Sequence, residues 1–166
     1  ERKVNTTYPS RIQQYQHQIE QISQDIVLLE QSKDGEFSIV LDGKPYTERP
    51  AAGDAFALLY HTINEKCAKD DFEFEIGSYR GFRLCLNLHP LSQGIILRGT
   101  SRYNTDIGSS GQGAITRIEN LAERISFYLI NTQRDLEEVE KQLEAARQQM
   151  GQPFIMRRNC PKRLLP

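Results

Sequence analysis

The sequence predicts an α+β fold in which two long helices form an antiparallel, coiled-coil-like hairpin around an inserted small antiparallel sheet with one helix. The first observation is that both ends of the chain repeat apolar residues at steps of three and four, which keeps one stripe along one side of a helix. The second is that residues 36–106 contain short runs of alternating apolar and polar residues between glycine-containing turns, a pattern typical of strands. We expect a single domain over residues 1–166, because this length supports one core.

The composition is that of an ordinary folded chain with a net charge of −1, so no overall electrostatic attraction to nucleic acid is predicted. No apolar run approaches the roughly 18 residues of a membrane helix, and no signal segment opens the chain, so we expect no membrane partner. Because the chain starts at Glu1 rather than Met, we expect a piece of a longer protein or a processed form. Only residues 151–166 are basic by composition, and we expect this tail to be flexible.

A first helix is predicted over residues 7–31. Ser10 is the expected N-cap, because a serine hydroxyl accepts a hydrogen bond from a free backbone N–H of the first turn. The Ser-Lys-Asp-Gly sequence of residues 32–35 ends the helix. Its apolar stripe covers about three heptads and consists of Ile12, Tyr15, Ile19, Ile22, Ile26 and Leu29.

A second, longer helix is predicted over residues 114–150, and its stripe has the spacing of a coiled-coil seam. Such a seam must be buried against a partner. We favour pairing with the first helix of the same chain over pairing with another copy in a homodimer. The stripe consists of Ile118, Leu121, Ile125, Tyr128, Thr132, Leu136, Val139, Leu143, Ala146 and Met150.

The middle of the chain, residues 36–106, is predicted to form an α+β head with three to five strands. Asp42-Gly43 is expected to be a hairpin turn. Pro50 suits the first turn of a helix that continues to about Cys67 and covers one face of the sheet. The expected strands are residues 37–41, 44–47, 72–76, 82–88 and 95–103.

Basic and aromatic side chains are concentrated in and beside the predicted sheet. In strands of period two, Arg98 and Arg102 share one face. If the arginines converge, they could follow a nucleic-acid backbone while a tyrosine stacks on a base. The alternative, which we favour on general grounds, is a solvated face whose arginines pair with Glu73 and Glu75. The nucleic-acid-binding candidates are Tyr79, Arg80, Arg83, Arg98, Arg102, Tyr103 and, in the first turns of the long helix, Arg117.

Other candidates for chemistry are weak. The stretch Gly108 to Gly113 precedes a helix and could hold a phosphate, but it lacks the ending of a P-loop, so a flexible connection is the simpler interpretation. The three cysteines and three histidines show no metal-ligand spacing, and neither a cofactor motif nor a catalytic triad can be assembled. Scattered cysteines suit a reducing cytoplasm. Asn120 interrupts the apolar stripe, and we expect it to be buried and to fix the register.

A series of short motifs resembles one protein family. The motifs are Tyr8-Pro-Ser-Arg-Ile12, Gln24-Asp25-Ile26, Asp42-Gly-Lys-Pro-Tyr-Thr-Glu-Arg49, Ile76-Gly-Ser-Tyr-Arg-Gly-Phe82, Leu97-Arg-Gly-Thr100 with Tyr103, and Arg117-Ile-Glu-Asn-Leu121. Over about residues 7–154 the chain is similar to the C-terminal accessory region of very large proteins of bacterial mobile elements and plasmids. Those proteins join a Swi/Snf-like helicase to an adenine-specific DNA methyltransferase. The Walker, D-E-x-H and N-P-P-Y motifs of these activities are absent here, so the resemblance implies no catalytic residue in this chain.

The resemblance implies a non-catalytic accessory domain of a cytoplasmic DNA-processing protein. The helical hairpin would be a rigid arm, and the head would contact DNA or the helicase and methyltransferase domains of a parent chain. The alternative is a structural module that dimerises through its coiled coil and does not touch nucleic acid. A stand-alone enzyme is disfavoured, because no acid, base and nucleophile converge in the sequence.

Overall fold

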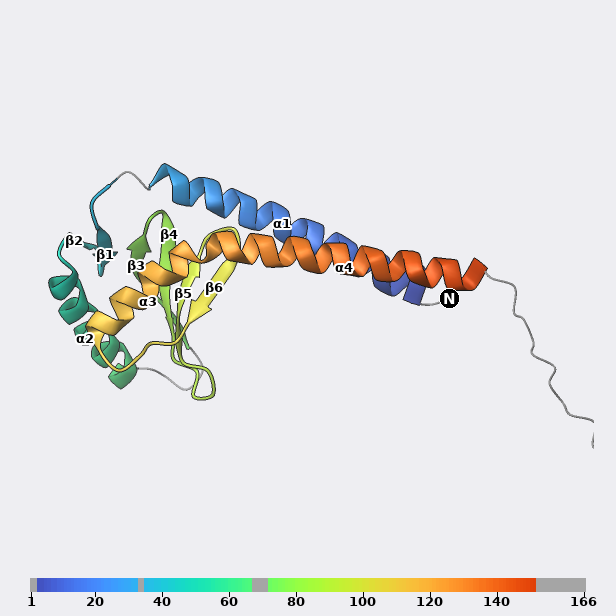
Figure 1. Cartoon of the computed structure of the whole chain (residues 1–166). Coiled ribbons are helices and arrows are strands. Elements are labelled where there is room, and N and C mark those ends of the chain that lie inside the picture. The colour runs from blue at the N-terminus through green and yellow to red at the C-terminus, as the bar shows by residue number, and fades with distance from the viewer. Residues whose placement is uncertain (1–2, 33–34, 67–71, 152–166) are drawn as a thin grey trace, which may run out of the picture.

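The chain forms two regions, a long arm of two helices and a head built around a sheet (Figure 1). The computed structural model describes residues 3–32, 35–66 and 72–151. The helices are η1 (Lys3–Thr7, a short π-helical segment), α1 (Tyr8–Gln31), α2 (Arg49–Lys66), α3 (Gly111–Glu123) and α4 (Ile125–Gly151). The strands are β1 (Ile39–Leu41), β2 (Lys44–Tyr46), β3 (Glu73–Tyr79), β4 (Phe82–Asn87), β5 (Gly94–Arg98) and β6 (Arg102–Thr105). The α+β class is therefore confirmed, while the predicted tail beyond residue 151 lies outside the described residues.

The strands form one antiparallel sheet in the order β2-β1-β3-β4-β5-β6. Six strands exceed the three to five that were predicted, because the predicted strand 95–103 is two strands joined by a turn. The register of β3 shifts between Glu75 and Gly77. A Cβ at Gly77 would lie 1.8 Å from the carbonyl oxygen of Val40, so only glycine allows β1 and β3 to approach this closely.

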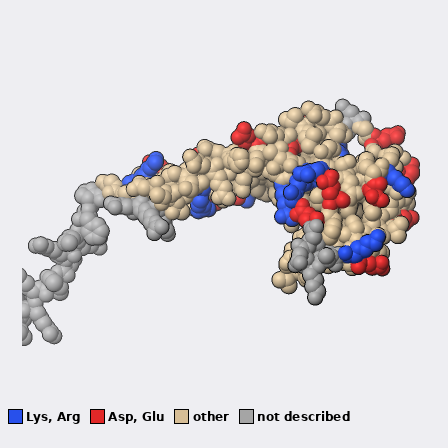
Figure 2. Space-filling model, turned by 180° about the vertical axis from the view of Figure 1, so that it is seen from behind, with Lys and Arg blue, Asp and Glu red and all other residues tan. Residues whose placement is uncertain are grey.

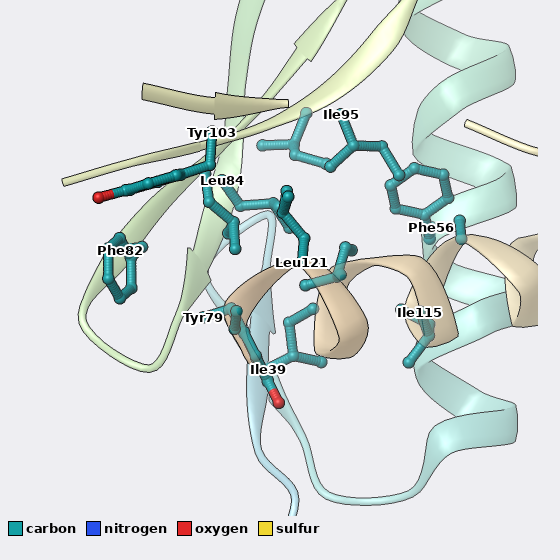
Figure 3. Packing of buried hydrophobic residues seen from close by; sticks show 14 of the residues in the cluster. Ile39, Phe56, Tyr79, Phe82, Leu84, Ile95, Tyr103, Ile115 and Leu121 are labelled. Atoms are coloured by element: carbon teal, nitrogen blue, oxygen red, sulfur yellow. The ribbon is translucent and has the colours of Figure 1, made fainter. Parts of the chain in front are cut away.

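Two helices, not the predicted one, cover a single face of the sheet. Helix α2 contacts β1 and β2, and α3 contacts α2, β5 and β6. Their apolar sides meet the inward-facing residues of the strands in one core, of which Figure 3 shows the part around Phe56, Ile95 and Ile115. The opposite face of the sheet carries the charged side chains. Alternation along the strands separates this apolar face from an outer face that carries the charged side chains together with the buried residues Cys85 and Ile96.

The predicted single helix over residues 114–150 is wrong, because the chain breaks at Arg124 into α3 and α4. The backbone of Arg124 has ψ −8°, and its carbonyl accepts a tight hydrogen bond from the N–H of Phe127 at 2.9 Å. The break divides the apolar stripe. Ile118 and Leu121 belong to the core of the head, where Ile125 is also fully buried, and do not form a seam with α1.

The arm consists of α1 and α4, which run side by side in opposite directions (Figure 1). The seam is therefore buried within one chain and gives no reason of its own to expect a second copy. Helix α1 begins at Tyr8, so Ser10 lies inside the helix and is not its N-cap as predicted. The seam residues buried in the arm are Val139 and Leu143, while Ile22 and Leu29 of α1 join the core of the head. The half-buried residues of the stripe are Ile12, Tyr15, Ile19, Ile26 and Leu136.

Candidate nucleic-acid interface

Three arginines form a row across neighbouring strands on the face of the sheet that is left uncovered by the helices the structure describes. Arg83 of β4 pairs in register with Arg98 of β5, and Arg98 pairs with Arg102 of β6. Neighbouring strands lie about 4.8 Å apart, so the row crosses the sheet at the spacing of the strands. These three side chains therefore lie together, which the sequence left open, and we call this set the arginine row.

Two glutamates of β3 lie among the arginines. Glu73 forms ion pairs with Arg98 and, at 3.2 Å, with Arg102, while Glu75 lies 3.7 Å from Arg83. Figure 2 shows acidic and basic side chains side by side on this side of the head. The pairing with Glu73 and Glu75 that the sequence suggested as an alternative is thus observed. Three guanidinium groups face two carboxylates, which leaves one excess positive charge.

The two candidate tyrosines lie on the other face of the sheet, so neither can stack on a base beside the arginine row. Tyr79 and Tyr103 are only 7% and 3% exposed. The rings of Tyr103 and Phe82 lie edge to face with 6.2 Å between their centres, at one end of the core (Figure 3). Burial is the main cause that raises the pKa of both tyrosines, and for Tyr103 the hydrogen bond to Asp25 raises it further.

A buried charged side chain lies between the arm and the head, and the sequence did not identify it. The carboxylate of Asp25, in α1, is 1% exposed. Its Oδ1 accepts the backbone N–H of Thr100 at 2.6 Å, and its Oδ2 accepts the N–H of Ser101 and the hydroxyl of Tyr103, both at 2.8 Å. A buried charge is costly unless it is hydrogen-bonded, and these three donors meet that need. Asp25 therefore fixes the arm to the β5–β6 turn.

Glycine at the β5–β6 turn allows this contact. A Cβ at Gly99 would lie 2.3 Å from Oδ1 of Asp25 and 2.8 Å from the ring of Phe82. The signal in the sequence was an aspartate inside the apolar stripe, three residues after Ile22, where only a paired charge can be buried. The sequence did not show which residues would pair with it.

Arg80 and Arg117 lie apart from the arginine row. Arg80 occupies the β3–β4 turn with φ 49°, followed by Gly81 with φ 83°, beside a cleft that Glu119 and Glu123 also line. Arg117 forms an ion pair with Asp106 at 3.0 Å and donates to the carbonyl of Gly113 at 3.2 Å. Its guanidinium packs against Gly108, so the glycine-rich stretch holds an arginine of its own chain.

The described residues offer little else for catalysis. They contain no group of His, Cys, Asp and Glu side chains placed to hold a metal, and none of their helices has the length and apolarity to cross a membrane. Burial, together with Glu73 and Glu75, raises the pKa of the Cys85 thiol, which opposes formation of a thiolate. Cys67 and Cys160 lie outside the described residues. Asn120 is exposed, so the expectation that it is buried is wrong.

Comparison of the chain with protein-family models, with curated proteins and with solved structures finds no match.

Proposed function

We propose that this chain is a non-catalytic accessory domain of a cytoplasmic DNA-processing protein, and that the head contacts the DNA backbone through the arginine row. The observation that carries the proposal is the register of Arg83, Arg98 and Arg102 on the uncovered face of the sheet. Its motifs resemble the accessory region of helicase–methyltransferase proteins, which supports DNA as the partner and a parent chain as the setting. In this proposal α1 and α4 act as a coiled-coil-like hairpin that holds the head away from the other domains.

The ion pairs on the uncovered face are compatible with DNA binding. The side chains of Arg83, Arg98 and Arg102 are between 37% and 58% exposed. Exposed ion pairs contribute little to stability, so a phosphate can take the place of a glutamate without a large loss. The planar guanidinium group binds phosphate through two parallel hydrogen bonds, which suits this exchange.

The test is fluorescence anisotropy of single-stranded and duplex DNA with the whole chain, at low and moderate salt. The variant Arg83→Ala/Arg98→Ala/Arg102→Ala is expected to bind both forms more weakly. Each lost phosphate contact is expected to reduce the salt slope by about 0.7 to 0.9. The control is Arg11→Ala/Arg134→Ala/Arg147→Ala, which removes the same charge from exposed positions of the arm.

A second variant tests the same site with the opposite sign. Glu73→Gln releases both Arg98 and Arg102 from their ion pairs. DNA is therefore expected to bind this variant more tightly than it binds the unmodified chain. No binding at low salt, or equal losses in the row variant and the arm control, would reject a DNA-contacting head. No binding to either DNA form is the result expected of a module that only dimerises, and light scattering would then detect the second copy.

A further inference from the structure

A polar groove follows β6, which is an edge strand of the sheet. Arg102 and Asn104 lie on the outer face of this strand, and both line two adjoining clefts. The cleft on the arm side, of about 430 Å³, lies between β6 and the helices α1 and α4. The other cleft, of about 370 Å³, lies between β6 and the loop after β4. Arg102 and Asn104 border both clefts, which lie next to each other beside the arginine row, and we call the two clefts together the groove.

The groove is lined mainly by amides and hydroxyls. Gln18 and Gln21 of α1 reach the arm-side cleft, and Gln93 reaches the other. A side-chain amide presents a donor and an acceptor together, which is the pattern that the edges of nucleic-acid bases match. Asp106, the acidic side chain in the groove, is paired with Arg117. Arg102, the basic side chain in the groove, is itself paired with Glu73 at 3.2 Å, so a phosphate beside it would take the place of that glutamate.

An exposed aromatic ring stands at the arm end of the groove. Tyr128 of α4 is 40% exposed, and its ring centre lies 5.5 Å from that of Tyr103 at 53°. Tyr103 is itself held by Asp25, so Tyr128 is supported from inside the protein by a fixed neighbour. The sequence placed a base-stacking role on Tyr79 or Tyr103, and the structure makes both of them core residues. The exposed aromatic ring beside the groove is that of Tyr128, which contacts Tyr103.

We infer that this groove binds a short single-stranded segment of DNA, with a base stacked on Tyr128 and the backbone beside Arg102. The inference rests on the proposed function and specifies the form of DNA that the head distinguishes. Bases of a duplex are already stacked and paired, so they cannot occupy Tyr128, whereas the arginine row contacts phosphates of either form. Stacking tolerates any base, so the groove prefers single strands without a strong sequence preference.

The test compares Tyr128→Ala with Tyr128→Phe in the whole chain, using an oligothymidine of about 12 nucleotides, within the range of single-strand sites, and a blunt duplex. Tyr128→Ala is expected to lose about tenfold or more in affinity for the single strand, the usual effect of removing one stacked base. Tyr128→Phe keeps the ring and should bind as the unmodified chain does. The control is Phe127→Ala, a neighbouring aromatic residue that is 64% exposed and does not line the groove.

Photo-crosslinking gives a second readout that does not depend on affinity. An iodinated deoxyuridine in the oligonucleotide is expected to attach to the peptide that contains Tyr128. Equal single-strand affinity of Tyr128→Ala, or equal losses for both DNA forms, overturns the inference, as does crosslinking confined to other peptides. An extended peptide added to the free edge of β6 would also leave Tyr128→Ala silent.

The two proposals fail in different ways. If the arginine-row variant binds both DNA forms as the unmodified chain does, the proposed function is wrong. If that variant weakens both forms while Tyr128→Ala changes neither, only the groove assignment is wrong. Circular dichroism and thermal unfolding of each variant separate a lost contact from a lost fold.

Discussion

The head and the arm bury their apolar residues to different extents. In the head, a six-stranded sheet and two helices enclose side chains such as Leu84, Ile95 and Ile118 completely, with 0% exposed. In the arm, two helices alone leave most of the stripe half-buried, and Leu143 retains 8% exposure. A two-helix contact cannot surround a side chain as a layered core does. The head is therefore expected to carry most of the stability, whereas the arm depends on its attachment to the head.

The attachment differs chemically from both regions that it joins. Neither the core of the head nor the seam of the arm buries a charge in the described residues, but the junction buries the carboxylate of Asp25. Its partners are two backbone N–H groups and a tyrosine hydroxyl, which require an acceptor at a defined position. An apolar seam can slide by one turn, whereas three hydrogen bonds to one carboxylate cannot.

The largest expected effect is a loss of stability in Leu84→Ala, in the head, which is compared with Leu143→Ala, in the arm. Leu84→Ala should lower the free energy of unfolding by about 3 to 4 kcal/mol, because the surrounding core cannot collapse into the cavity. Leu143→Ala should cost about half of that or less, because neighbouring arm residues can relax toward solvent. Urea unfolding of both variants measures the difference. Equal losses would show that the arm and the head share one equally packed core.

The next effect concerns the junction. Asp25→Asn should lower the free energy of unfolding by about 2 to 3 kcal/mol, because its amide nitrogen faces donors that then lack an acceptor. The amides of Thr100 and Ser101 should also exchange hydrogen faster, which NMR detects. Glu20→Gln is the matched control, because it makes the same kind of change at an exposed position of the same helix, and it should stay within about 0.5 kcal/mol. A junction variant as stable as this control would mean that apolar contacts alone fix the arm.

The smallest expected effect concerns the hydroxyl of Tyr103, and it changes with pH. Tyr103→Phe removes one hydrogen bond to Asp25 and should cost about 1.5 kcal/mol at pH 7. The pKa of Tyr103 is raised above its ordinary value of 10.0 in the folded chain, so the unfolded chain releases this proton first. The stability that the protonated Tyr103 contributes is therefore complete below pH 10 and is lost as the pH rises above that value. Across this pH range the free energy of unfolding should fall less steeply for Tyr103→Phe than for the unmodified chain. Parallel curves would contradict this role of Tyr103.

Periodicity predicted the regular parts of this fold. Steps of three and four located α1 and the part of α4 that packs against it, and alternation located β3 and β4 and put Arg98 and Arg102 on one face. The same alternation places Tyr103 and Arg102 on opposite faces of the sheet. The inward position of Tyr103 was therefore already implied by the rule that grouped the arginines. The candidate set combined residues from both faces because it followed residue type.

Two features had no periodic signal. The break at Arg124 contains neither proline nor glycine, and the apolar spacing continues across it without a change of step. What changes there is the partner, from the sheet to α1, and a pattern within one helix does not identify its partner. The contact between Asp25 and Thr100 joins residues 75 positions apart, so it depends on the assembled tertiary structure.

The arrangement of the arm has a mechanical consequence. The N-terminal segment η1 contacts α4, so the first and last described residues lie near each other at the end remote from the head (Figure 1). Helix α4 has 27 residues, which at about 1.5 Å per residue places the head about 40 Å away. A load that separates the two ends would open the helices one turn at a time, as a zipper opens, instead of shearing the whole seam at once. The opening would stop at the β5–β6 turn, where force would meet the hydrogen bonds of Asp25.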